Sequence, residues 1–437
     1  MTSLPAARAG SPGGGSPSAP CSGADGGRDV GPNDAPGSVD PALPLGIALA
    51  VAPVAVVLQS KAVAPIATVA LAAVVLAYRR RHGAWPWPRG RVAWTALALF
   101  AWAAVTAAWA MEPWRGLGTA LQIGSFVALG AGAARALAAT EAAARGRLLR
   151  LATAGLVLGL AAAGFDAVTG QALRAFVRGL AEVPPTLAFG LKPAASAMAL
   201  WLPLVAAAPL PRWLRALVLV GGAAVLLALP GESAKLSVLA AAAAAGLVLL
   251  APRRAPRTIG LGIAAVLLLM PAILGPVLAQ GVPAGGLPPS AAHRLLIWDF
   301  TITRIAERPL LGWGMEASRS VPGHRDSPDA ALLQRFGLTG TSLAAWIPRS
   351  QLLPLHPHNG ALQLWLELGL PGAMLAALLA ALLGRACLRT GRPVVASAML
   401  AGGTVTALLS FGAWQEWWVG AELMAVAAAA ALPARSA

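Results

Sequence analysis

A succession of long apolar stretches, separated by short polar loops, is the feature that most restricts how this chain can fold. Hydrophobic residues make up 57% of its 437 residues and charged residues only 11%, against about 25% charged residues in an ordinary soluble domain. A helix needs about 20 mainly apolar residues to cross a bilayer, where it must satisfy its own backbone hydrogen bonds. The sequence therefore predicts an all-α integral membrane protein.

About twelve stretches have the length and apolar character of membrane-spanning helices. The expected spans are 44–60, 62–78, 92–110, 117–139, 149–168, 193–210, 213–230, 235–251, 258–279, 359–383, 393–412 and 416–433. One long polar segment separates the ninth span from the tenth. We therefore divide the chain into a tail (1–43), spans one to nine (44–279), an outer segment (280–357) and spans ten to twelve (358–437).

The tail over 1–43 consists mostly of Gly, Pro, Ser, Ala and Asp. It has no apolar run of the kind found in signal peptides, and too little apolar surface to form a folded core. We expect a disordered cytoplasmic tail. Of the two cysteines, Cys21 lies in this tail and Cys387 lies beside a basic loop, so neither a disulfide framework nor a thiolate metal site is predicted.

Clustered arginines set the expected orientation, because cytoplasmic loops carry an excess of Lys and Arg. With the N-terminus inside, the clusters Arg79–Arg81, Arg145–Arg150 and Arg253–Arg257 all fall in cytoplasmic loops. Both termini are then cytoplasmic, and the outer segment is periplasmic. The formal charge of +16 does not predict nucleic-acid binding, because most arginines lie in short blocks between apolar runs and not on a water-facing domain.

The outer segment is unusually basic for its predicted side of the membrane. It holds Arg294, Arg304, Arg308, Arg319, Arg325, Arg335 and Arg349, with His293, His324 and His356, and His358 follows directly. The three lysines, Lys61, Lys192 and Lys235, also fall outside. The avoidance of positive charge on the outer side applies to short loops, and a loop of this length escapes it. The rule therefore does not account for the cations of the outer segment, which need a local reason. An anionic ligand on the outer face supplies one.

The stretch "PLHPHNGALQLWLELGLPG" gathers scarce polar side chains where the tenth span begins. Asn359, Gln363 and Glu367 are spaced by four and share one face of a helix. Polar groups at membrane depth are costly when unsatisfied and generally line a cavity or a helix interface. We expect these three to line a cavity. The alternative is that they only join the tenth helix to its neighbours.

His356 and His358 stand at the water–membrane boundary just before this stripe. Nearby arginines disfavour a charged imidazole, which lowers its pKa and leaves the neutral form that a general base requires. The two histidines could also be ligands of a zinc ion, but no neighbouring His, Asp or Glu residues complete the usual set of three or four ligands. We expect no metal here.

The stretch "HRLLIWDFTITRIAERPLLGWGMEASRS" predicts an amphipathic helix over about 291–307, ended by Arg308 and a proline. Arg294, Arg304 and Arg308 are either a solvated helix face or a set of guanidiniums that grips phosphate. In "PGESAKL", Lys235 at the outer start of the eighth span either extends to the interface or reaches an anion.

The order of these features resembles the bacterial O-antigen ligases and the related O-antigen polymerases. The resemblance is carried by "PGESAKL", then by Arg294 and Trp298 with "ERPLLGWG", then by "HPHNGALQLWLELGLPG". It covers about residues 227–383. The family commonly has Ser-Arg in the first patch, where this chain has Ser233, Ala234 and Lys235, and a lysine supplies a point charge and not a planar fork.

The resemblance implies a multi-pass protein of the bacterial inner membrane with its active site on the periplasmic side. It implies a glycosyltransferase, without metal or nucleotide cofactor, that moves a glycan from a polyprenyl diphosphate carrier to an acceptor hydroxyl. Lipid A-core is the expected acceptor, and a growing glycan or a protein is the alternative. His358 or His356 would be the catalytic base, and Arg294, with Lys235 or Arg304, would bind the diphosphate. A transporter or flippase remains the non-enzymatic alternative, because about twelve spans with both termini inside is also a common carrier architecture.

Overall fold

The computed structural model describes residues 40–340 and 345–433. The predicted tail over 1–43 lies outside the described residues as far as residue 39, and a helix already begins at Ala42. Within the described ranges the chain forms helices and loops and contains no strand.

Each of the twelve predicted spans corresponds to a helix. These helices are α1 (Ala42–Leu58), α2 (Val63–His82), α3 (Arg91–Thr106), α4 (Pro113–Leu137), α5 (Ala142–Val168), α7 (Leu191–Trp201), α8 (Arg212–Ala228), α9 (Glu232–Leu250), α10 (Ala255–Gln280), α13 (Gly360–Cys387), α14 (Pro393–Leu409) and α15 (Glu416–Ala430). Three further helices lie between them: α6 (Ala172–Val177), α11 (Pro289–Glu307) and α12 (Ala330–Arg335). The amphipathic helix predicted over 291–307 is α11, so that prediction is confirmed.

Eight helical stretches in the described chain are long and apolar enough to cross a membrane, judged by length and composition. They comprise α2, α3, α4, α5, α9, α10, α13 and the stretch Pro185–Ala207 that contains α7. The other four predicted spans, α1, α8, α14 and α15, have only 15 to 17 residues. At about 1.5 Å per residue they are shorter than a hydrocarbon core of about 30 Å. For α14 and α15 the reason is local, because the loop 410–415 between them takes residues that would otherwise extend both.

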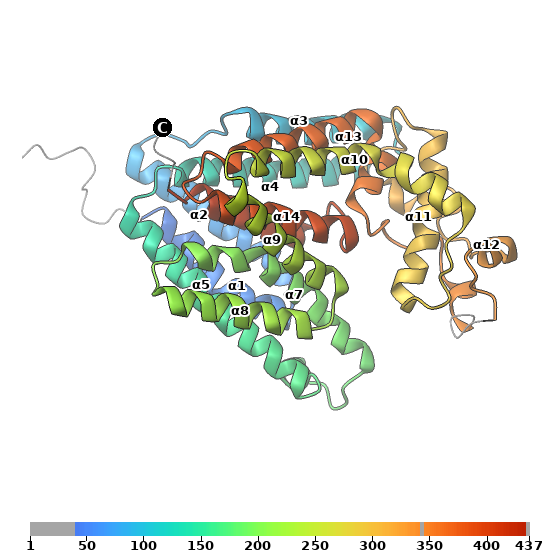
Figure 1. The fold of residues 1–437 in the computed structure, drawn as a ribbon. Helices are drawn as coiled ribbons and strands as arrows, with labels where there is room; N and C mark the ends of the chain where they lie inside the picture. The colour runs from blue at the N-terminus through green and yellow to red at the C-terminus, as the bar shows by residue number, and fades with distance from the viewer. Residues whose placement is uncertain (1–39, 341–344, 434–437) are drawn as a thin grey trace, which may run out of the picture. The chain divides into compact units, whose positions relative to one another are not determined.

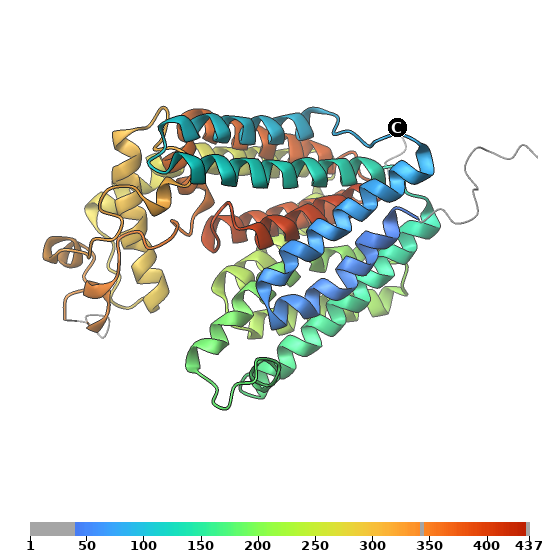
Figure 2. The ribbon, with the colours of Figure 1, turned by 180° about the vertical axis from the view of Figure 1, so that it is seen from behind.

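The two described chain ends meet at one end of the helices. Arg147 binds Asp40 at 2.7 Å, and the neighbouring Arg145 donates to the carbonyl oxygen of Ala431 at 2.7 Å. Both arginines belong to the first two turns of α5. Helices α11 and α12 lie at the opposite end of α3, α10 and α13 in both views (Figure 1 and Figure 2). This arrangement is the one expected for an even number of spans.

Helix α13 departs from the single regular span that the sequence predicts. It breaks at Gly369, where φ is 64°, a left-handed conformation that glycine adopts without steric cost. The carbonyls of residues 366–368 are therefore free to accept hydrogen bonds from outside the helix. They accept them from the backbone of Trp313 and Gly314 and from the indole of Trp102. The outer segment is thereby attached to the N-terminal part of α13.

Candidate functional site

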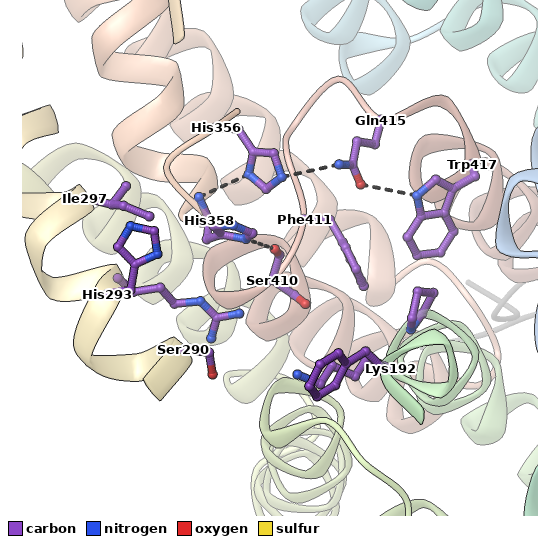
Figure 3. A pocket seen from close by; sticks show the side chains of 13 residues that line it. Lys192, Ser290, His293, Ile297, His356, His358, Ser410, Phe411, Gln415 and Trp417 are labelled. Atoms are coloured by element: carbon purple, nitrogen blue, oxygen red, sulfur yellow. Dashed lines mark hydrogen bonds between the residues drawn. The ribbon is translucent and has the colours of Figure 1, made fainter. Parts of the chain in front are cut away.

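A cavity of about 450 Å³ lies where α7, α11, the start of α13 and the α14–α15 loop approach one another (Figure 3). Its polar lining includes Lys192, His293, Arg294, His356 and His358. Its apolar lining includes Phe189, Ile297, Phe411 and Trp417. The cavity therefore combines cations and imidazoles with aromatic walls. It brings together three residues predicted from the sequence, Arg294, His356 and His358.

Arg294 and Lys192 are the two lining cations, and both are unpaired. Neither the guanidinium of Arg294 nor the ammonium of Lys192 has a hydrogen bond or ion pair with any other residue in 40–340 or 345–433. Lys192 lies 4.5 Å from the ring centroid of Phe189, which is a cation–π distance. Burial lowers the pKa of Arg294, but an arginine keeps its charge at any physiological pH. Two positive charges thus face one cavity and neither forms an ion pair, although Glu232 is close enough to act on the charge of Lys192.

Lys235 and Arg304, which we expected to bind diphosphate with Arg294, do not line this cavity. Lys235 forms an ion pair with Glu232 at 2.9 Å, and Arg304 forms one with Glu307 at 2.6 Å. Arg304 also lies over the ring of Phe300, 5.1 Å from its centroid. In each case the acid is three residues away in the sequence, on the same helix face. The charges of Lys235 and Arg304 are therefore already paired with neighbouring acids.

His358 has one ring nitrogen fixed and the other open to the cavity. Its Nδ1 lies 2.6 Å from the carbonyl oxygen of Ser410. A carbonyl oxygen only accepts, so Nδ1 carries the proton and Nε2 keeps its lone pair. No described residue occupies Nε2. The backbone of His358 has φ of 53°, a left-handed conformation that is uncommon for a residue other than glycine.

His356 is engaged on both ring nitrogens. Its Nδ1 accepts from the backbone N–H of His358 at 3.1 Å, and its Nε2 lies 3.3 Å from the side-chain amide of Gln415. Only 5% of its surface is exposed. The sequence left open which histidine is the base. Of these two histidines, only His358 offers a ring nitrogen that a substrate hydroxyl could approach.

Both imidazoles are neutral at pH 7. Burial lowers the pKa of His358 from 6.5 to about 4, aided by the charge of Arg294 and opposed by the Ser410 carbonyl. Burial also lowers the pKa of His356, to about 3, and the positive charges of a protonated His358 and of Arg319 add to this. The predicted direction therefore holds, but its largest cause is burial and not the neighbouring arginines. A buried cationic imidazole would lose hydration that the protein does not replace.

The stripe of Asn359, Gln363 and Glu367 is buried beside the histidine wall and does not line this cavity. Asn359 caps α13, because its side-chain oxygen accepts from the backbone N–H groups of Ala361 and Leu362. Gln363 accepts from the backbone N–H of Ala413 at 2.9 Å, in the α14–α15 loop. These contacts fix the backbone that directly follows His358 and Ser410. Asn359 and Gln363 therefore support the cavity wall without lining it.

Glu367 is the centre of a closed network. Its Oε1 accepts from the Ser318 hydroxyl at 2.5 Å and from the Gln363 amide at 3.0 Å. Its Oε2 accepts from the backbone N–H of Glu316 and from the Trp414 indole, each at 2.7 Å. Four donors satisfy a carboxylate that is fully buried. The network joins α13 to the outer segment and to the α14–α15 loop.

Sequence reasoning gave no site role to Lys192, Phe189 or His293, which line the cavity. Lys192 and Phe189 lie between the fifth and sixth predicted spans and belong to no motif, and only the outward position of all three lysines gave a signal. His293 was counted among the outer histidines but received no role. Its Nε2 lies 2.8 Å from the Gln351 carbonyl, and burial lowers its pKa. Neutral His293 adds polarity to the wall beside Arg294 without adding charge.

Cysteine, histidine and carboxylate side chains do not assemble into a candidate metal centre in the described parts of the chain. No group of three or more of them comes together there. Cys387 is free and buried. The polar groups of the cavity are instead cations, imidazoles and an amide, a set suited to an anion and to proton transfer.

Comparison with known proteins identifies one region of the chain. Residues 216–377 match the family described as O-antigen ligase, which confirms the resemblance drawn from the motifs. Proteins provisionally named polysaccharide ligases are similar to the chain. One from Rickettsia conorii is 30% identical over 165 residues, covering 36% of this chain and 37% of that protein. One from Rickettsia bellii is 32% identical over 164 residues, covering 36% of each.

The matched part of the chain spans little more than a third of the length of these relatives. It contains Arg294, His356 and His358, whereas Lys192, Ser410 and Gln415 lie outside the family match. No solved structure matches the chain.

Proposed function

Because residues 216–377 match the O-antigen ligases, we propose that the protein transfers a glycan from a polyprenyl diphosphate carrier to an acceptor hydroxyl, with lipid A-core as the acceptor. The proposal rests mainly on one observation. An unpaired guanidinium, that of Arg294, and an imidazole nitrogen with an unoccupied lone pair, that of His358, line the same cavity. The first suits a diphosphate and the second suits a hydroxyl proton.

In the proposed reaction, Nε2 of His358 takes the proton of the acceptor hydroxyl. The hydroxyl oxygen attacks the anomeric carbon of the glycan from the face opposite the carrier and forms the new glycosidic bond. The bond from that carbon to the diphosphate oxygen breaks, its electron pair stays on the diphosphate, and the anomeric configuration inverts. Arg294 stabilises the charge on the departing diphosphate.

The Ser410 carbonyl has a defined part in this step. It holds Nδ1 of His358 as the protonated nitrogen, and its oxygen stabilises the positive charge on the ring once Nε2 gains a proton. A second hydrogen-bonding group plays this orienting part in other histidine bases. The low pKa of His358 makes it a weak base that is present in the active form throughout the physiological range.

We further propose that all twelve helices span the bacterial inner membrane, with both chain termini in the cytoplasm and the cavity on the periplasmic side. Asp40 and Ala431, near the two described chain ends, lie at the same end of the helices, which supports an even number of spans. The arginine-rich first turns of α5 lie at that same end, as expected for the cytoplasmic side. Cysteine-scanning labelling of intact cells at Ser290 and at Gly146 tests this orientation. Labelling at residue 146 and not at residue 290 would reverse it.

Purified protein in detergent tests the activity directly. We expect it to join carrier-linked glycan to lipid A-core without a membrane gradient or nucleotide. His358→Asn should lose this transfer, because asparagine keeps a donor for the Ser410 carbonyl and tolerates a positive φ but is not a base. Normal transfer by this variant would refute the proposal.

The lipopolysaccharide banding of a deletion strain identifies the acceptor. Loss of all capped core indicates ligation to lipid A-core, whereas loss of long chains alone indicates polymerisation. Unchanged lipopolysaccharide together with loss of glycan on proteins indicates protein glycosylation. Transfer that requires an intact, energised membrane and fails in detergent would favour a transporter.

A further inference from the structure

The cavity has a second wall that the family match does not include. The segment from Asp166, at the end of α5, to Pro193, in the first turn of α7, contributes Phe189, Lys192 and Pro193 to the lining. The wall opposite carries Arg294 on α11. Figure 3 shows Lys192 on the side of the cavity away from His293 and His356. A ligand held by Arg294 within this cavity therefore also faces this second wall.

A fully buried ion pair holds this segment together. Asp166 and Arg174 have side chains with no exposed surface, and Nε of Arg174 donates to Oδ2 of Asp166 at 2.6 Å. The backbone N–H of Arg174 donates to Oδ1 at 2.9 Å. A second nitrogen of the guanidinium, Nη1, donates to the carbonyl oxygen of Leu187, further along the chain, at 2.6 Å. One arginine thus ties α5 to the short helical turn Pro185–Gly190 that precedes α7.

Gly190 makes room for this guanidinium. A Cβ at residue 190 would lie 2.3 Å from Nη1 of Arg174, far inside the contact distance of real atoms. The φ of Gly190 is −66°, so its backbone does not require glycine. The absence of a side chain matters because the arginine passes there. Lys192 follows two residues later.

A buried ion pair is costly to desolvate, and hydrophobic residues of similar volume often stabilise a fold as well or better. Its value can lie in fixing one geometry where apolar packing would allow several. Here that geometry is the approach of residues 187–192 to the cavity. The residue that this approach delivers is Lys192, which forms no ion pair, whereas the other candidate, Lys235, is paired with Glu232 at 2.9 Å.

We propose that Lys192 is the second phosphate-binding cation of the cavity, and that Asp166 and Arg174 are the residues that position it. This inference rests on the proposed function and names the group that shares the carrier diphosphate with Arg294. A diphosphate carries at least two negative charges. Arginine can grip one phosphate with its planar fork, and lysine adds a compact point charge for the other.

Binding of undecaprenyl diphosphate to the purified full-length protein in detergent tests the first part. We expect Lys192→Ala to weaken binding about tenfold or more, as for loss of a charge-assisted hydrogen bond. Lys61→Ala removes an exposed lysine from another predicted outer loop and should bind as the wild type does. Binding by Lys192→Ala equal to that of the wild type, or an equal loss in Lys235→Ala, would overturn the assignment.

A double-mutant cycle tests the positioning. Arg174→Lys keeps the charge but loses the second arm, and Gly190→Ala keeps both charges and displaces the guanidinium. Each should weaken binding of undecaprenyl diphosphate in the wild-type background and add little in the Lys192→Ala background. A merely structural role would lower binding by the same factor in both backgrounds, and that result would overturn it. Gly190→Ala answers the question if Arg174→Lys fails to fold.

Two controls keep this inference separate from the proposed reaction. His358→Asn should lose transfer and still bind undecaprenyl diphosphate, with binding still dependent on Lys192. If it retains transfer, the proposed reaction fails while the binding result stands. Displacement of undecaprenyl diphosphate by an equal concentration of phosphatidylglycerol would show a site for phospholipid headgroups in general and would overturn the assignment to the carrier.

Discussion

Two polar clusters meet near the N-terminal end of α13, and they differ in whether their atoms have partners. Around Glu367, both carboxylate oxygens receive two donors each, and nothing is left for a ligand. Around the cavity, Arg294, Lys192 and Nε2 of His358 have no hydrogen bond or ion pair with any described residue. The first cluster is complete by itself. The second has charges and a lone pair that only a molecule from outside can satisfy.

The contrast shows that burial of polar residues does not by itself mark a functional site. The most deeply buried polar side chain of the stripe, Glu367, has a structural role, while the half-buried Arg294 and His358 are the groups available for chemistry. Free energy explains the difference. A buried polar atom without a partner is costly, so an unpaired group is retained where a ligand completes it.

The largest effect should come from removing the base. His358→Asn is expected to lower the rate of glycan transfer by about 10² to 10⁴, the usual contribution of a positioned general base. The melting temperature in detergent should stay within a few degrees of the wild type. A transfer rate within tenfold of the wild type would show that His358 is not the base. His358 would then have a structural role, as Glu367 does, and the two clusters would not differ in function.

The opposite pattern is expected for Glu367→Gln. The new amide group would face donors where an oxygen accepted, so the variant should lose on the order of 3 kcal/mol of stability. Thermal unfolding in detergent measures this, with Glu416→Gln, at an exposed position, as the matched control. An unchanged melting temperature with abolished transfer would mean that Glu367 belongs to the chemistry.

A smaller loss should follow from Arg294→Lys, which keeps the positive charge but removes the planar fork. We expect the KM for the carrier-linked glycan to rise about tenfold, with a modest loss in kcat. Arg325→Lys makes the same change at an exposed arginine that does not line the cavity. Equal effects of the two substitutions would show that the overall electrostatic potential of the outer segment governs binding. The location of Arg294 in the cavity would then have no special importance.

The smallest effect is expected from pH. The pKa of His358 is lowered to about 4, so the base form is lost only as pH falls through that value. The kcat/KM for transfer should therefore change less than about twofold between pH 6 and pH 8. A base with the ordinary pKa of about 6.5 would lose about fourfold between pH 8 and pH 6. A fall of that size would show that water enters the site more freely than its burial implies.

The helices could be predicted from sequence because a bilayer permits few alternatives. A backbone in hydrocarbon must satisfy itself within one helix, so the length of an apolar run predicts the helix directly. The break in α13 at Gly369 escaped this reasoning. It depends on carbonyls that are satisfied by Trp102 and Trp313, which are distant in sequence.

The site was predictable only where its signal was local. His356, His358 and Arg294 lie in short motifs, and the structure brings them to one cavity. Lys192 has no motif, because its place depends on a buried pair formed after the chain turns back at the end of α5. For Lys235 the acid three residues away, Glu232, was visible in the sequence. Spacing alone does not tell whether a cation prefers that neighbour to a ligand.

The break at Gly369 has a consequence for how substrates reach the cavity. The backbone N–H of Leu370 bonds to Pro309, and the carbonyls of residues 366 and 367 bond to Trp313 and Gly314. Separating residues 309–314, which directly follow α11, from α13 would break these bonds, at about 1–3 kcal/mol for each group left buried without a partner. The histidine and arginine walls therefore behave as one rigid frame. Phe189 also lines the cavity, is 59% exposed and takes part in none of these bonds, so we expect a lipid-borne ligand to enter past it at lower energetic cost.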